Sequence, residues 1–146
     1  MKALVVYDSV HGNTEKVAQA IGAAIPGTVL VSRVGLVSAR DLDALDLLVI
    51  GSPTVGGRPT ASIQAFVNGL PESTASRVRL AAFDTRITLK FARVFGYAAP
   101  RVAEALARKC SGGPVPAEGF IVRGRSGPLA DGELERAAEW GRKASR

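Results

Sequence analysis

Apolar residues follow two different periods along this chain. Five short runs rich in β-branched and apolar residues predict buried strands, at positions 2–8, 28–34, 46–53, 77–84 and 117–123. In the stretches 14–24, 63–70, 98–109 and 131–143, apolar residues recur every three or four positions, as on one face of a helix. Glycines and prolines separate many of these segments. Positions 85–96 fit neither period, and the sequence leaves open whether they form a loop or extend the next helix.

The order of these elements predicts the fold class. Strands that alternate with helices are typical of an α/β fold with a parallel sheet. At 146 residues, with no internal repeat or change of composition, the chain is expected to form one domain over positions 1–146. In the last helix, the expected inner residues are Leu134, Ala137, Ala138 and Gly141, with Trp140 beside them.

A small, hydroxyl-rich loop follows the first strand and leads into the first helix. It consists of Ser9, Val10, His11, Gly12, Asn13 and Thr14. Backbone N–H groups of such a loop and of the first helical turn converge on one point, which the helix dipole makes positive. Hydroxyl and amide side chains add further donors. The pattern therefore predicts a phosphate site, although a plain turn with a helix cap is the alternative.

This loop resembles the phosphate loop of the flavodoxins, in which Ser or Thr and two small or variable positions precede Gly-Asn-Thr. The resemblance covers most of the chain. It implies a doubly wound, five-stranded parallel sheet in the order 2-1-3-4-5, with FMN as the cofactor. In that order the loops after Asp8, Ser52 and Asp84 share one edge of the sheet. All three are places where the sequence becomes polar or rich in glycine.

The loop after the third strand contains the next group of expected cofactor contacts, Pro53, Thr54, Val55, Gly56 and Gly57. The resemblance implies that Val55 covers the flavin. It also implies that the Gly56–Gly57 peptide can turn its carbonyl toward flavin N5 after uptake of one electron and one proton, since glycine accepts positive φ. The alternative is a loop whose glycines serve only the turn.

The loop after the fourth strand begins with Asp84, Thr85 and Arg86, which we expect at the pyrimidine edge of the flavin. An inward-pointing Arg86 would favour the anionic reduced flavin and raise the second reduction potential. A solvated basic surface is the alternative. Flavodoxins often stack Trp or Tyr on the ring. Here the candidates for the second face are Tyr97, Phe91 and Phe95, whereas Trp140 is expected far from the site.

Composition sets limits on the chemistry. The chain has one cysteine, so it cannot form an internal disulfide. One cysteine and one histidine are too few to support a zinc site. We assign no metal ligands and no catalytic residue, and we expect His11 to supply mainly its backbone. The short apolar run after Met1 and Lys2 is neither a signal peptide nor a membrane span, so we expect a cytoplasmic protein without an integral membrane segment.

The chain carries a net charge of +6, whereas flavodoxins are usually acidic. A basic surface favours acidic redox partner proteins. We do not expect a nucleic-acid partner.

Other families with related folds lack their key residues here. A response-regulator receiver needs a phospho-accepting Asp at the end of the third strand, where this chain has Gly51, Ser52 and Pro53. The Gly-Lys-Ser/Thr of a P-loop NTPase and the Gly-x-Gly-x-x-Gly of a dinucleotide fold are absent, and Cys110 lies far from the first loop, where a small phosphatase would need it.

Two classes of function remain. The first is an FMN-binding carrier that shuttles low-potential electrons between redox proteins. A variant of this class is an FMN-dependent oxidoreductase acting on quinones or protoporphyrinogen. The second class is a flavin-free interaction module. We expect an electron carrier rather than an enzyme that turns over a small substrate.

Overall fold

The computed structural model describes residues 1–88, 95–110 and 112–146, and within these residues five strands form one parallel sheet. The strands are β1 (Lys2–Tyr7), β2 (Thr28–Arg33), β3 (Leu47–Pro53), β4 (Arg79–Ile87) and β5 (Ala117–Val122). Their order in the sheet is β2-β1-β3-β4-β5, and all neighbouring pairs are parallel. This order confirms the predicted doubly wound α/β fold.

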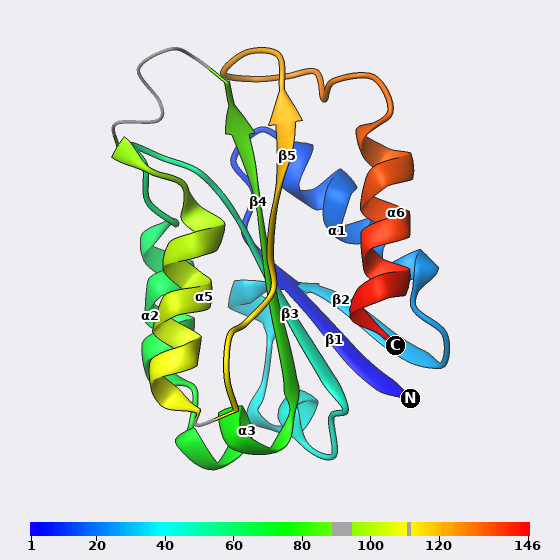
Figure 1. Cartoon of the computed structure of the whole chain (residues 1–146), viewed down its shortest axis with the longest axis vertical. Helices are drawn as coiled ribbons and strands as arrows, with labels where there is room; N and C mark the ends of the chain where they lie inside the picture. The colour runs from blue at the N-terminus through cyan, green and yellow to red at the C-terminus, as the bar shows by residue number, and fades with distance from the viewer. Residues whose placement is uncertain (89–94, 111) are drawn as a thin grey trace.

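Helices cover both faces of the sheet (Figure 1). On one face lie α1 (Asn13–Ala24) and α6 (Glu133–Ala144), which pack against each other. On the other lie α2 (Ala61–Gly69) and α5 (Ala98–Lys109), with the short α3 (Glu72–Arg77) at the amino end of β4. Two short 3₁₀ turns, η1 (Val34–Leu36) and η2 (Ala39–Leu42), connect β2 to β3. No helix within the described ranges is long and apolar enough to cross a membrane.

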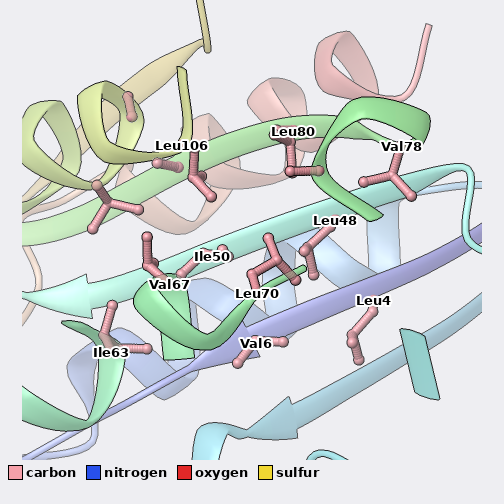
Figure 2. Close-up of a cluster of buried hydrophobic side chains, with 14 of the residues drawn as sticks. Leu4, Val6, Leu48, Ile50, Ile63, Val67, Leu70, Val78, Leu80 and Leu106 are labelled. Atoms are coloured by element: carbon pink, nitrogen blue, oxygen red, sulfur yellow. The ribbon is translucent and has the colours of Figure 1, made fainter. Parts of the chain in front are cut away.

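The central strands are buried on both faces because helices lie above and below them. From Ala3 to Tyr7, every side chain of β1 is buried, and β3 is buried from Leu47 to Ser52. One apolar cluster fills the space between the sheet and the α2–α5 layer. Figure 2 shows this cluster, in which aliphatic side chains of β1, β3 and β4 meet Ile63, Val67 and Leu106 of the helices.

A second cluster lies under α1 and α6. Val17, Ala18, Ile21 and Ile25 from the first helical segment are buried there, as their spacing predicts. Three aromatic rings, those of Phe83, Phe120 and Trp140, pack edge to face with centroids 6.2–6.3 Å apart. Trp140 is partly buried and packs against this core, away from the carboxyl edge of the sheet.

The last helix differs from its predicted orientation. Leu134 was expected in the core but is 41% exposed, whereas Glu133 is only 8% exposed. Ala137 and Gly141 are buried as predicted. The buried stripe thus begins one residue earlier than Leu134, because the Glu133 carboxylate accepts a hydrogen bond from the backbone N–H of Ile121 at 2.6 Å.

Glu133 and Arg136 together cover the free edge of β5. Arg136 donates to both carboxylate oxygens of Glu133, at 2.8 and 2.9 Å, and also to the Gly119 carbonyl. The Arg136 hydrogen bond holds the pKa of the Glu133 carboxyl below its usual value, although burial opposes this shift. An edge strand presents unpaired backbone groups to solvent, and these two side chains occupy some of them.

Two segments between β3 and α5 also differ from the sequence-based expectation. A helix, α3, occupies positions 72–77, where none was expected, so β4 begins at Arg79 rather than at Arg77. At its other end β4 continues through Thr85, Arg86 and Ile87. Positions 89–94 lie outside the described residues, and so does Phe91.

Candidate functional site

A cavity of about 420 Å³ opens at the carboxyl edge of the sheet, at the upper end of the strands in Figure 1. Open α/β sheets bind ligands at this edge, where the strand order reverses between β1 and β3. The carboxyl ends of β3, β4 and β5 line the cavity together with the segments that follow β1, β3 and β5. The lining residues are Val10, His11, Asn13, Thr14, Pro53, Thr54, Val55, Gly56, Thr85, Arg86, Ile87, Val122, Gly124 and Arg125.

The first loop places the start of α1 at this cavity. Gly12 precedes the helix with φ +92°, and the Ser9 hydroxyl oxygen accepts hydrogen bonds from the N–H groups of Gly12 at 3.0 Å and Glu15 at 3.4 Å. Within the described residues, the N–H groups of Asn13 and Thr14 have no protein acceptor. These two donors, at the positive end of the helix dipole, can bind an anion.

Two residues hold the first loop in place, Tyr7 at the end of β1 and Arg33 at the end of β2. One Arg33 nitrogen donates to the Ser9 carbonyl at 3.0 Å and lies 3.7 Å from the Asp8 carboxylate. The Tyr7 hydroxyl donates to the Glu15 carboxylate at 2.6 Å. Burial and this hydrogen bond raise the pKa of Tyr7 above its usual value, so the hydroxyl keeps its proton and the contact is maintained.

The second loop is a tight hairpin turn. The backbone groups of Val55 and Arg58 exchange two hydrogen bonds of 2.8 and 3.0 Å. The two residues between them, Gly56 and Gly57, have φ values of +57° and +79°. Positive φ at both central positions defines a type I′ turn, which explains the glycine pair. Gly57 also lies against the backbone of Phe95, where a Cβ atom would approach the carbonyl oxygen to 2.2 Å.

Hydroxyl groups attach this hairpin to its neighbours. The Thr54 N–H donates to the Thr85 carbonyl at 2.9 Å, and the Thr54 hydroxyl oxygen accepts from the Ala98 N–H at 3.1 Å. The Ser52 hydroxyl oxygen accepts from the Thr60 N–H at 3.0 Å. The hairpin is therefore hydrogen-bonded to β4 and to the first turn of α5, and these bonds fix its position relative to the sheet.

Thr14 and Thr85 join the first loop to the end of β4. Their hydroxyl oxygens are 2.8 Å apart, and both side chains are at least nine-tenths buried. Two hydroxyl groups have two hydrogens, and their mutual bond uses one of them. The other hydrogen is free to donate to a ligand oxygen in the cavity.

Asp84 and Arg86 form a charge pair at the end of β4. The Arg86 guanidinium donates to both oxygens of Asp84 at 2.8 Å, and Asp84 also accepts from the Ala99 N–H at 2.7 Å. The guanidinium lies over the Tyr97 ring, 3.7 Å from its centroid, and against Gly119, where any side chain would overlap it. Arg86 thus faces the cavity as one partner of a neutral ion pair. Its attraction for an anionic ligand in the cavity is therefore weaker than that expected of an unpaired arginine.

A fourth segment, after β5, was not expected at the site. Gly124 and Arg125 line the cavity, and the backbone of Gly127 lies against the Asn13 side chain. In a parallel sheet the end of β5 shares the edge used by β1, β3 and β4. This topological argument, applied to the glycine-rich segment 124–128, could have identified the fourth loop from the sequence.

Ten of the fourteen residues expected at the site line the cavity. The other four, Ser9, Gly12, Gly57 and Asp84, do not line the cavity, but each is hydrogen-bonded to a lining residue or next to one in the sequence. Among the three aromatic candidates, Tyr97 stacks on Arg86 and Phe95 is 61% exposed beside Gly57, so neither lines the cavity. Phe91 falls outside the described residues.

Comparison with known proteins identifies related sequences and folds. A family model described as a flavodoxin domain matches residues 4–91. A flavodoxin from the domain Archaea has 21% sequence identity and a TM-score of 0.79, and the match covers 99% of this chain and 96% of the other. Flavodoxin 1 from Bacillus cereus has 17% identity and a TM-score of 0.77, with 99% and 97% covered.

The same fold also occurs as part of a longer chain. Rubredoxin oxygen:oxidoreductase from Desulfovibrio gigas has 17% identity and a TM-score of 0.77, and the match covers 99% of this chain but 35% of that one. No curated protein sequence matches this chain. At these identities the similarity to solved structures shows the fold.

Proposed function

The chain belongs to the flavodoxin domain family, and from this premise we propose that it binds FMN and carries electrons between redox proteins in the cytoplasm. The observation that carries the proposal is the cavity at the carboxyl edge of the sheet. Backbone N–H groups that can bind an anion lie at one end of the cavity, and its lining includes the exposed apolar side chains of Val10 and Val55. Its volume of about 420 Å³ lies in the range of small-molecule sites.

The first loop suits the phosphate of FMN. The N–H groups of Asn13 and Thr14 point from the positive end of α1, and the Thr14–Thr85 hydroxyl pair has one hydrogen left to donate. Beside this loop, the Arg33 guanidinium lies 3.7 Å from the Asp8 carboxylate and 3.8 Å from the Glu15 carboxylate, so it offsets part of the negative charge of these two groups.

Apolar side chains suit the ring of FMN. Val10 and Val55 line the cavity yet are 63% and 55% exposed, and a flat apolar ligand would cover them. Bound FMN would supply reversible one-electron chemistry. The Gly56–Gly57 turn would place backbone amide groups beside the ring, because glycine lets both residues keep positive φ.

Absorption spectroscopy tests this proposal. We expect the purified protein, after addition of FMN and gel filtration, to retain one FMN per chain. During stepwise anaerobic reduction, a long-wavelength flavin radical band should accumulate, which indicates one-electron transfer. Direct bleaching without this band would favour a two-electron oxidoreductase acting on a quinone or protoporphyrinogen. Absence of FMN binding would refute the proposal and favour a flavin-free interaction module.

A further inference from the structure

The positive charge of this protein is concentrated in one part of the chain. Positions 47–116 contain nine basic and three acidic residues. Positions 1–46 contain four basic and five acidic residues, and positions 117–146 contain six and five. The middle segment therefore accounts for the entire net charge of +6. It supplies α2 and α5, whereas α1 and α6 on the opposite face come from the nearly neutral parts.

A groove of about 210 Å³ lies between α2 and α5. Arginines from both sides border it, namely Arg58 before α2 and Arg101 and Arg108 on α5. The amide side chains of Gln64 and Asn68 lie beside them on α2. The Gln64 amide already donates to the Pro59 carbonyl at 2.8 Å. The guanidinium groups provide the charged donors that suit carboxylate ligands.

Few acidic groups on these helices oppose the arginines. Helix α2 contains no charged residue, and the one acidic residue of α5 is Glu104. Glu104 pairs with Arg108 at 3.2 Å, but both side chains are at least 70% exposed, so solvent screens this pair strongly. Lys109 adds another positive charge, and its amino group donates to the Asn68 and Leu70 carbonyls at the end of α2.

The groove is connected to the proposed flavin site through Arg101. Its Nε atom donates to the Gly57 carbonyl at 2.8 Å, and an Nη atom donates to the Phe95 carbonyl at 2.9 Å. Arg58, at the other side of the groove, closes the hairpin that contains Gly57. A partner in the groove would therefore contact the residues that position the second loop, close to the cavity.

We propose that the groove between α2 and α5 docks an acidic segment of the partner protein with which this chain exchanges electrons. The identity of the partner as a redox protein rests on the proposed function, whereas the location and charge preference rest on the groove. A lipid surface fits less well, because a membrane-binding helix presents large apolar side chains to the bilayer. Within the described residues, α2 and α5 expose none.

A peptide-binding experiment with two matched variants tests this inference. The probe is a fluorescein-labelled peptide with four glutamates spaced by glycine and alanine, and fluorescence anisotropy reports its binding. The groove variant combines Arg58→Glu with Arg108→Glu. The control combines Arg142→Glu with Lys143→Glu on α6, at exposed positions on the other face. Both variants change the net charge equally, so a general field effect would be the same in both.

We expect the groove variant to weaken peptide binding by at least about tenfold and the control to weaken it by less than about twofold, since local charge pairs dominate specificity. Added salt should weaken binding to the wild-type protein. Equal losses in both variants, or no binding to the wild-type protein, would overturn the inference. So would groove-dependent binding to vesicles containing phosphatidylserine without peptide binding, which would indicate a lipid surface.

FMN titration of the same proteins separates this inference from the proposed function. Both variants should bind FMN like the wild-type protein, because none of the four substituted side chains lines the cavity. Arg58 closes the hairpin through its backbone N–H and carbonyl alone, and the substitution keeps both groups. Groove-specific peptide binding without FMN binding would support the docking surface and refute the electron carrier. FMN binding without peptide binding would leave the electron carrier in place and overturn the docking surface.

Discussion

Arg125 offers the sharpest test of how the cavity binds a phosphate. This exposed residue lines the cavity from the loop after β5. Two positions further on, the backbone of Gly127 lies against Asn13, so this loop adjoins the end of the cavity where the α1 N–H groups point. We therefore predict that Arg125→Ala weakens binding of FMN and leaves binding of riboflavin, which lacks the phosphate, nearly unchanged.

The size of this effect follows from Coulomb's law. Two unit charges at about 4 Å interact by about 1 kcal/mol in water and by about 4 kcal/mol at an effective dielectric constant of 20. Arg125 is exposed, so the lower value applies, and a phosphate monoester carries roughly 1.5 to 2 charges at neutral pH. The expected loss is therefore about 1–2 kcal/mol, or roughly 5-fold to 30-fold in Kd.

Quenching of flavin fluorescence measures both dissociation constants, and Arg123→Ala is the matched control. Arg123 belongs to the same loop but pairs with Asp131 at 2.9 Å and does not line the cavity. The control should leave FMN affinity within about twofold, because exposed ion pairs contribute little. Equal weakening of FMN binding by both substitutions, or equal weakening of FMN and riboflavin by Arg125→Ala, would refute the assignment of Arg125 to the phosphate end.

Two further predictions concern stability. Gly57→Ala should destabilise the protein by about 2–5 kcal/mol in urea unfolding, because positive φ and a backbone contact with Phe95 both oppose a Cβ atom. Gly56→Ala should cost only about 1–2 kcal/mol, because space is open there; equal losses would refute this difference. Glu133→Gln should cost about 1.5–3 kcal/mol at pH 7, where Glu133 is ionised and bonded to Arg136. Folding lowers the pKa of Glu133. Its contribution to the free energy of unfolding is therefore complete at pH values above the ordinary pKa of glutamate, and it declines as the pH falls through the folded-state pKa. The stability of the variant should therefore decrease less on acidification than that of the wild-type protein. The same pH dependence of stability in both proteins would contradict this.

The features that the sequence predicts best depend on local patterns. The apolar runs that became β1 and β3 are buried on both faces, so their composition alone identifies them. The first loop is found by its short motif directly after a strand. The paired glycines Gly56 and Gly57 predict a turn because few other residues accept positive φ at two successive positions.

The features that the sequence did not reveal depend on contacts between distant segments. Leu134 was placed in the core because it is apolar, but the structure buries Glu133, whose partner Ile121 lies on another element. Likewise, Arg33 and Arg101 have no motif around them. Each acts through a hydrogen bond to a carbonyl far away in the sequence, Ser9 for the first and Gly57 for the second.

The residues expected at the site have two different roles, since some hold the loops in place and others line the cavity. Ser9 and Gly57 belong to the expected site, yet neither lines the cavity, and each instead holds a loop whose neighbours do. Val10 and Val55 line the cavity and are largely exposed, so they contribute little to folding. Substitutions of the first pair should therefore change stability and FMN affinity together. Substitutions of the two valines should change FMN affinity alone, and combined thermal unfolding and FMN titration distinguish these two classes.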